Sequence, residues 1–162
     1  MSPSLPAALG ADAASTSASC SALADMVDCP LGDAPARVRL YYGVRTSEPG
    51  RGRRTRVGGA EGVHLASNDG SIGHHGFITD LLDSHPAPQH LFGCGPEPML
   101  YALAKLAERK QIPCHVSLET PMACGVGICF SCVTRVKTDD GWDYKRVCVD
   151  GPVFESAKLC WD

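Results

Sequence analysis

The sequence predicts an α/β protein in two parts: a parallel sheet with helices, and then a small β-rich lobe built around a metal centre. Three observations support this. Short apolar runs of strand-forming residues alternate with helical patterns between residues 37 and 118. Four of the nine cysteines lie between residues 124 and 148. The stretch that ends at the last of these four has the pattern of a β-hairpin.

Composition narrows the possible functions. The chain has 162 residues, of which 44% are hydrophobic, and its 15 basic and 18 acidic side chains give a net charge of −3. It lacks the basic excess of nucleic-acid-binding proteins, and it has no apolar run of about eighteen residues that could cross a membrane. We therefore expect no nucleic-acid or membrane partner. Cysteines in a chain without a secretory signal predict a cytoplasmic protein with a metal site rather than a disulfide framework.

Residues 1–36 contain no lysine or arginine and are rich in alanine, serine, proline and aspartate. Secretory signals and transit peptides need basic residues, so neither fits. Low hydrophobicity without periodicity predicts a disordered or low-complexity leader. We interpret Cys20 and Cys29 in this stretch as incidental thiols.

The next elements alternate between strand and helix. Val38–Val44 is rich in β-forming residues and predicts a strand, and residues 62–66 predict a second. The turn at 68–71 follows, with residues that tolerate a left-handed backbone. Residues 77–82 then show apolar side chains at helical spacing.

A third strand is predicted at 89–92, a helix at Glu97–Lys110 and a fourth strand at 113–118. This alternation implies a parallel sheet, which binds ligands at the carboxyl ends of its strands, where the turn at 93–96 would lie. No glycine-rich phosphate loop precedes Val38. We therefore expect residues 37–118 to form a partial nucleotide-binding domain without its first strand.

The cysteine spacing is the most specific signal. Cys124, Cys129 and Cys132 have the spacing C-x4-C-x2-C, and Cys148 follows after fifteen residues. This pattern is typical of plant-type 2Fe–2S clusters. Glycines between the first two cysteines would let the loop wrap closely and bring amides to the sulfurs.

The alternative is a four-cysteine zinc site, which usually has two C-x2-C pairs, whereas only one such pair occurs here. Cys160 is the alternative fourth ligand, but a near-terminal residue is poorly held, so Cys148 is favoured. Cys114 falls on a predicted strand and is interpreted as a small buried hydrophobe.

Residues 133–136 and 144–147 flank Asp139-Asp140-Gly141, which is a hairpin signal, and Cys148 follows as a ligand from a separate strand. Residues 119–162 are therefore predicted to form a small β-rich cluster-binding lobe. Its stability should depend on the metal.

Longer motifs extend these observations: SNDGSIGHHGFITD at 67–80, CGPEPM at 94–99, SLETPMACGVGICFSC at 117–132 and VCVDGPVF at 147–154. From about residue 38 to its end, the chain resembles the electron-transfer (iron–sulfur, FAD/NAD-linked) subunit of the two-subunit dihydroorotate dehydrogenase. The fold implied is a ferredoxin-reductase-like NAD-binding domain followed by a 2Fe–2S lobe. The FAD-holding β-barrel that opens this family has no counterpart here, so we expect an N-terminally truncated member.

The resemblance implies an accessory electron-transfer subunit in pyrimidine biosynthesis, with no catalytic residue of its own. Its partner would be an FMN-containing catalytic subunit that oxidises dihydroorotate, in a hetero-oligomer with two copies of each subunit. Electrons would pass singly through the 2Fe–2S cluster to FAD and then as a hydride to NAD.

The resemblance also implies functional residues, which are assigned to the matching positions of this sequence. The implied cluster ligands are Cys124, Cys129, Cys132 and Cys148. The implied lining of the nicotinamide–flavin meeting point is Gly93, Cys94, Gly95 and Pro96, and the nearby loop residues are Asp69, Gly70 and Ser71.

Two other functions remain open. One is a stand-alone 2Fe–2S ferredoxin-like carrier, which would contain no flavin. The other is the flavin subunit of a related ferredoxin:NADP or sulfide oxidoreductase. The Ser-Leu-Glu and Met-Ala-Cys-Gly sequences around the cluster motif favour the dihydroorotate enzyme.

Overall fold

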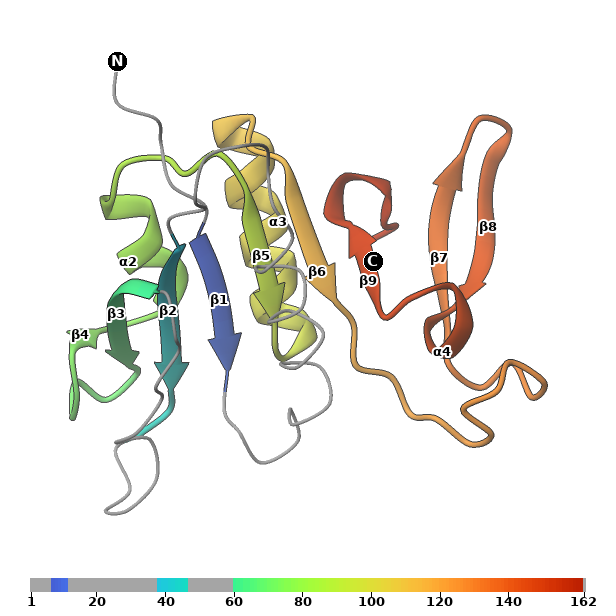
Figure 1. Ribbon diagram of the computed structural model, residues 1–162, viewed down its shortest axis with the longest axis horizontal. Helices are drawn as coiled ribbons and strands as arrows, with labels where there is room; N and C mark the ends of the chain where they lie inside the picture. Colours follow the sequence, from blue (N-terminus) through green and yellow to red (C-terminus); the bar gives the residue numbers. More distant parts are fainter. Residues whose placement is uncertain (1–6, 12–37, 47–59, 162) are drawn as a thin grey trace.

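The computed structural model describes residues 7–11, 38–46 and 60–161, and most of its strands form one sheet (Figure 1). This seven-stranded sheet has the order β4-β3-β2-β1-β5-β6-β9. Neighbouring strands are parallel except at β9, which runs antiparallel to β6. The strands are β1 (Ala7–Ala11), β2 (Val38–Val44), β3 (Ala60–Ser67), β4 (His74–His75), β5 (Leu91–Cys94), β6 (Cys114–Ser117) and β9 (Val153–Glu155).

Strand β1 lies at the centre of the sheet. Its Ala7 is paired with Arg39 of β2 on one side and with Leu91 of β5 on the other. The prediction of an unstructured leader is therefore wrong for residues 7–11, and so is the prediction that the sheet lacks its first strand. A short run of mostly small residues has little β-propensity, and pairing on both edges defines this strand instead. The rest of 1–36, with Cys20 and Cys29, lies outside the described residues.

The other predicted elements of the sheet region are confirmed with small shifts. The helices are α2 (Ile78–Ser84) and α3 (Glu97–Lys110), and α3 has the predicted bounds. Strand β5 begins two residues later than predicted, at Leu91, whose amide donates to the Pro113 carbonyl. No helix in the described part of the chain is long and apolar enough to cross a membrane.

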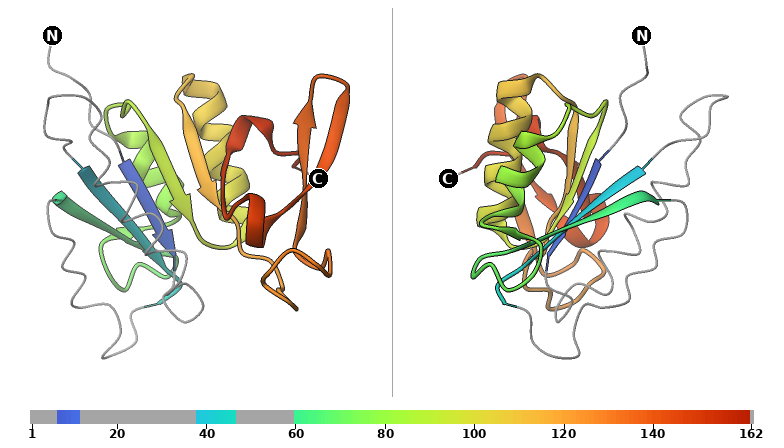
Figure 2. Two further views of the ribbon diagram at one scale, coloured as in Figure 1. Left: turned by 45° about the vertical axis from the view of Figure 1, so that its right-hand side comes forward. Right: turned by 90° about the vertical axis from the view of Figure 1, so that its left-hand side faces the viewer.

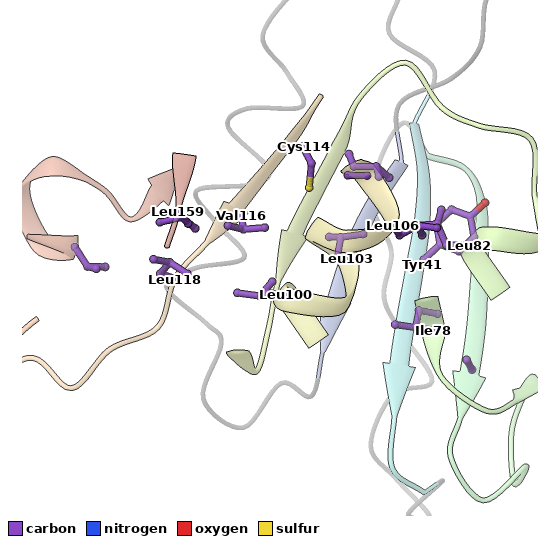
Figure 3. Packing of buried hydrophobic residues seen from close by; sticks show 14 of the residues in the cluster. Tyr41, Ile78, Leu82, Leu100, Leu103, Leu106, Cys114, Val116, Leu118 and Leu159 are labelled. Carbon is purple, nitrogen blue, oxygen red and sulfur yellow. The ribbon is translucent and has the colours of Figure 1, made fainter. Parts of the chain in front are cut away.

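Helices α2 and α3 lie on the same face of the sheet (Figure 2). Five residues of α3 are buried against it, with Leu100 and Leu103 almost fully covered, and α2 adds Ile78 and Leu82 to the same core (Figure 3). Gly93 of β5 allows α3 to approach closely, since a Cβ at this position would overlap the Leu103 side chain. This packing fixes the turn between β5 and α3 at the carboxyl edge of the sheet.

The C-terminal stretch forms the predicted hairpin and then returns to the large sheet. Strands β7 (Val133–Thr138) and β8 (Gly141–Arg146) are antiparallel, and the one-turn helix α4 (Val147–Asp150) follows. Beyond β9, the 3-10 turn η1 (Ser156–Lys158) leads to Leu159, which bridges to Val136 of the hairpin. The large sheet thus contains a strand from the predicted cluster lobe.

Cys148 lies in α4, so the prediction that it sits on a strand is wrong. The chain turns there because the Asp150 carboxylate accepts a hydrogen bond of 2.7 Å from the Arg146 amide. A carboxylate that binds an amide at the start of such a turn is a short-range interaction with no periodic signature.

Candidate metal centre

The loop between β6 and β7 contains the first three cysteines, and its main-chain amides surround the sulfur of Cys124. The amides of Val126, Ile128 and Cys129 lie 3.4–3.5 Å from Cys124 Sγ. Hydrogen bonds from the Cys129 amide and then from Val126 lower the pKa of Cys124 to about 6. The loop therefore stabilises a thiolate at this position, which is the form that binds a metal.

Two glycines with left-handed backbone conformation let the loop wrap around the Cys124 sulfur. Gly125 and Gly127 have φ angles of 67° and 81°, where a side chain is disfavoured. A Cβ on Gly127 would also lie 2.6 Å from Val149 Cγ2, whereas one on Gly125 would meet no atom within 4 Å. The glycines predicted to shape the loop thus act differently: Gly127 is in close contact with α4, and Gly125 is open.

Cys132 and Cys148 form the second half of the centre. The interaction between the two thiols lowers the pKa of Cys132 and raises that of Cys148. The Val147 amide donates to the Cys132 carbonyl over 2.7 Å, so the main chain holds the two residues together. Cys132 is buried, and Cys148 is half-buried.

The four predicted ligands come together as two pairs. Cys124 accepts the amide of Cys129, the main chain holds Cys132 beside Val147 and Cys148, and the Cys124 and Cys148 thiols interact electrostatically. Within the described residues, no three His, Cys, Asp or Glu side chains are grouped around one position that could hold a single metal ion. Two thiol pairs, with amides on one sulfur, suit the donor set of a 2Fe–2S cluster, which is held by four thiolates on two irons.

The rival ligand Cys160 follows η1 and lies beside the middle of β7. Its amide donates to the carbonyl of Arg135, in the middle of β7, over 3.0 Å. Cys148 instead contacts Cys132. Cys114 is buried on β6, as interpreted from the sequence.

Exposed apolar side chains lie in the same loop and helical turn as the cysteines, and the sequence reasoning missed them. They lie in the loop 119–132 and on α4, with exposed fractions from 51% to 78%: Met122, Val126, Ile128, Phe130 and Val149. Such clustering on a surface marks an interaction site more often than chance exposure does. The signal in the sequence was the alternation of Val126, Ile128 and Phe130 with glycine and cysteine in the loop.

The predicted nucleotide-site residues lie at the carboxyl edge of the sheet. Cys94 ends β5 beside Ser117 of β6, and the turn to α3 follows. The thiol of Cys94 is fully buried, while Pro96 is exposed. Ser67 and the turn after it end β3 at the same edge.

In that turn, Asp69 accepts hydrogen bonds from the amide and the hydroxyl of Ser71, at 3.0 and 2.5 Å. Bonds from Ser71 and then from Thr46 hold the pKa of Asp69 well below its usual range. Buried Ser67 closes the turn, because its hydroxyl binds both the amide and the carbonyl of Ile72. The turn is thus a built loop, and Gly70 has the left-handed φ of 72° that it requires.

The two thiol environments predict different reactivity in the iron-free protein. At about pH 7.5 we expect iodoacetamide to label Cys124 well before Cys114, because amide hydrogen bonds lower the pKa of Cys124 to about 6 and burial raises that of Cys114 to about 11. Since only the thiolate reacts, labelling of Cys124 should fall about tenfold per pH unit below its pKa. Peptide mass spectrometry measures both rates. Equal rates at the two cysteines would contradict this assignment.

The segment that contains the four cysteines is similar to known proteins. The family described as the iron–sulfur cluster binding domain of dihydroorotate dehydrogenase B matches residues 119–160. The resemblance to that family is confirmed. Among curated relatives, the NAD(+)-dependent dihydroorotate dehydrogenase B electron transfer subunit of Caldanaerobacter subterraneus subsp. tengcongensis is 41% identical over 98 residues. That of Shouchella clausii is 46% identical over 99 residues.

The match covers 60% of this chain and 37–40% of those relatives, so the chain spans about two-fifths of their length. A solved structure described as an NADH-dependent reduced ferredoxin-NADP oxidoreductase, studied for flavin-based electron bifurcation, has a TM-score of 0.73. It is 24% identical and covers 99% of this chain, which covers 54% of it. This likeness shows that the chain has a fold of the reductase type.

Proposed function

We propose that Cys124, Cys129, Cys132 and Cys148 hold one 2Fe–2S cluster, and that the chain is an electron-transfer subunit of an NAD-linked dihydroorotate dehydrogenase. The observation that carries the proposal is the pair-wise approach of the four thiols within the segment that matches the cluster-binding family. When bound, such a cluster accepts and releases one electron at a time.

The residues of this chain would supply three properties to that centre. Amides from Val126, Ile128 and Cys129 place positive dipoles on the Cys124 sulfur, which favours the thiolate. Cys132 is buried, which shields one end of the site from solvent. Cys129 is exposed, so the other end lies at the surface, where electrons can leave or enter over a short distance.

The apolar residues around the loop suggest where the partner binds. We propose that Met122, Val126, Ile128, Phe130 and Val149 are covered by an FMN-containing catalytic subunit. Burial of this exposed surface would contribute to association, and it would place the partner beside Cys129. A complex with two copies of each subunit is the arrangement implied by the family resemblance.

We also propose that the carboxyl edge of the sheet takes the nicotinamide and flavin cofactors of the family. The turn 93–96 and the loop 69–71 meet the requirement that such ligands bind beyond the strand ends. The hydrogen-bonded Asp69–Ser71 turn has a fixed shape for contact with a ligand. Flavin and nucleotide content of the purified chain is the direct check on this part.

Anaerobic preparation of the chain tests the cluster. We expect about two irons and two sulfides per chain and a rhombic signal in the reduced EPR spectrum. Zinc in place of iron, or no metal, would overturn the proposal. The catalytic subunit, reduced with dihydroorotate, should then bind the chain and bleach its visible absorption. A chain that contains the cluster but is neither bound nor reduced would be a ferredoxin-like carrier for another donor.

A further inference from the structure

Arg146 lies between the two halves of the candidate centre. It ends β8, precedes α4, and stands two residues before Cys148. Its backbone is paired with Val133, the residue after Cys132. The main chain at Arg146 is therefore fixed next to two of the four cysteines.

The side chain of Arg146 reaches the other two cysteines through the loop that bears them. Its Nη1 donates to the Gly127 carbonyl over 3.0 Å, in a partly buried position between Cys124 and Cys129. Its guanidinium also lies 5.4 Å from the centre of the ring of Phe130, which is the residue after Cys129. Gly127 and Phe130 both have left-handed φ angles, 81° and 53°. Arg146 thus contacts the loop at two left-handed residues, of which Phe130 carries a side chain that disfavours this conformation.

Asp150 orients this side chain. One carboxylate oxygen of Asp150 accepts the Arg146 amide at 2.7 Å and lies 3.4 Å from Arg146 Nε. The guanidinium therefore faces α4 with one nitrogen and the loop with another. The planar guanidinium reaches the two acceptors from separate nitrogens, whereas all the donors of lysine are on one nitrogen.

Gly127 completes the connection. Its carbonyl binds Arg146, and its Cα packs so closely on α4 that a Cβ there would lie 2.6 Å from Cγ2 of Val149, the residue after Cys148. We propose that Arg146 is a positioning residue that fastens the three-cysteine loop to the helical turn carrying Cys148, and so sets the lifetime and potential of the cluster. This inference rests on the proposed function, because it concerns the same four ligands.

The test compares Arg146→Ala and Arg146→Lys with Lys145→Ala. Lys145 is a matched control, since it is the adjacent cation and pairs with Asp143 rather than with the loop. We expect Arg146→Ala to release iron to a chelator at least about tenfold faster than the unmodified chain. The reduction potential of the cluster in Arg146→Ala should be lower than in the unmodified chain, because the variant loses a cation beside the sulfurs and the contact that fixes the loop. Arg146→Lys should recover part of both effects, and Lys145→Ala should change neither.

Two results would overturn the proposal: equal release rates and potentials in Arg146→Ala and the unmodified chain, or the same changes in Lys145→Ala. Arg146→Lys keeps the positive charge, and it replaces Arg146→Ala in the comparison if Arg146→Ala does not fold. If the unmodified chain holds no iron, the proposed function fails, and the effect of Arg146 on the loop is then measured without metal. In that case amide hydrogen exchange at residues 124–130 should be faster in the Arg146 variants than in the unmodified chain. Unchanged exchange would show that Arg146 does not position the loop.

Discussion

Replacement of Cys148 by serine should remove most of the iron from the protein and abolish the rhombic EPR signal. The hydroxyl of serine ionises far less readily than a thiol and is a poorer ligand for iron, so one iron would lose half of its protein ligands. Cys148 interacts with Cys132, whereas the amide of Cys160 is bound to the Arg135 carbonyl in the middle of β7, so we expect no other described thiol to take the place of Cys148. Iron and sulfide assays after anaerobic preparation measure the loss.

Cys160→Ser is the matched control for this change. Cys160 lies in the same C-terminal stretch and is also partly exposed, but it is held beside Arg135 by its amide. Iron content and spectrum should therefore be unchanged in this variant. If Cys160→Ser lost the cluster while Cys148→Ser kept it, the fourth ligand would be Cys160. Because metal binding contributes to folding, Cys148→Ser should also unfold at a lower temperature than the control.

Most of the sheet region could be predicted from local patterns, since its elements carry strong ones. Helix α3 has five residues buried on one face and has the predicted bounds. The hairpin β7–β8 was indicated by the turn at Asp139-Asp140-Gly141 between β-forming runs. Strand β1 could not be predicted, because Ala7–Ala11 is defined by its pairing with β2 and β5 and has no apolar alternation.

In the candidate centre, too, the sequence indicates some residues and not others. The C-x4-C-x2-C spacing predicts Cys124, Cys129 and Cys132 as ligands, whereas the choice of Cys148 over Cys160 depends on the argument that a near-terminal residue is poorly held. The residues that support the centre leave no such pattern. Arg146 contacts Gly127 across 19 positions of sequence, and the exposure of Ile128 and Phe130 depends on how the loop folds. These contacts come from tertiary structure, which a single sequence records only indirectly.

Gly127→Ala should strongly impair cluster binding, whereas Gly125→Ala should have a much smaller effect. Both glycines have left-handed φ angles, so a side chain costs about 1–2 kcal/mol at either position. Only at Gly127 does the new methyl group also meet a neighbour, 2.6 Å from Val149 Cγ2. Real Cβ atoms do not approach so closely, so either Val149 or the loop must shift. Valine is β-branched and has few alternative rotamers, so we expect the loop to move away from α4.

That movement would separate the two cysteine pairs. Gly127 lies between Cys124 and Cys129, its carbonyl accepts a hydrogen bond from Arg146, and it packs against Val149, the residue after Cys148. We therefore expect Gly127→Ala to bind less iron than Gly125→Ala and to release it to a chelator at least about tenfold faster. Val149→Ala tests the cause, since removal of the contacted methyl groups should restore binding in the double variant Gly127→Ala/Val149→Ala. If the two single glycine variants behaved alike, backbone conformation rather than contact with α4 would control the loop.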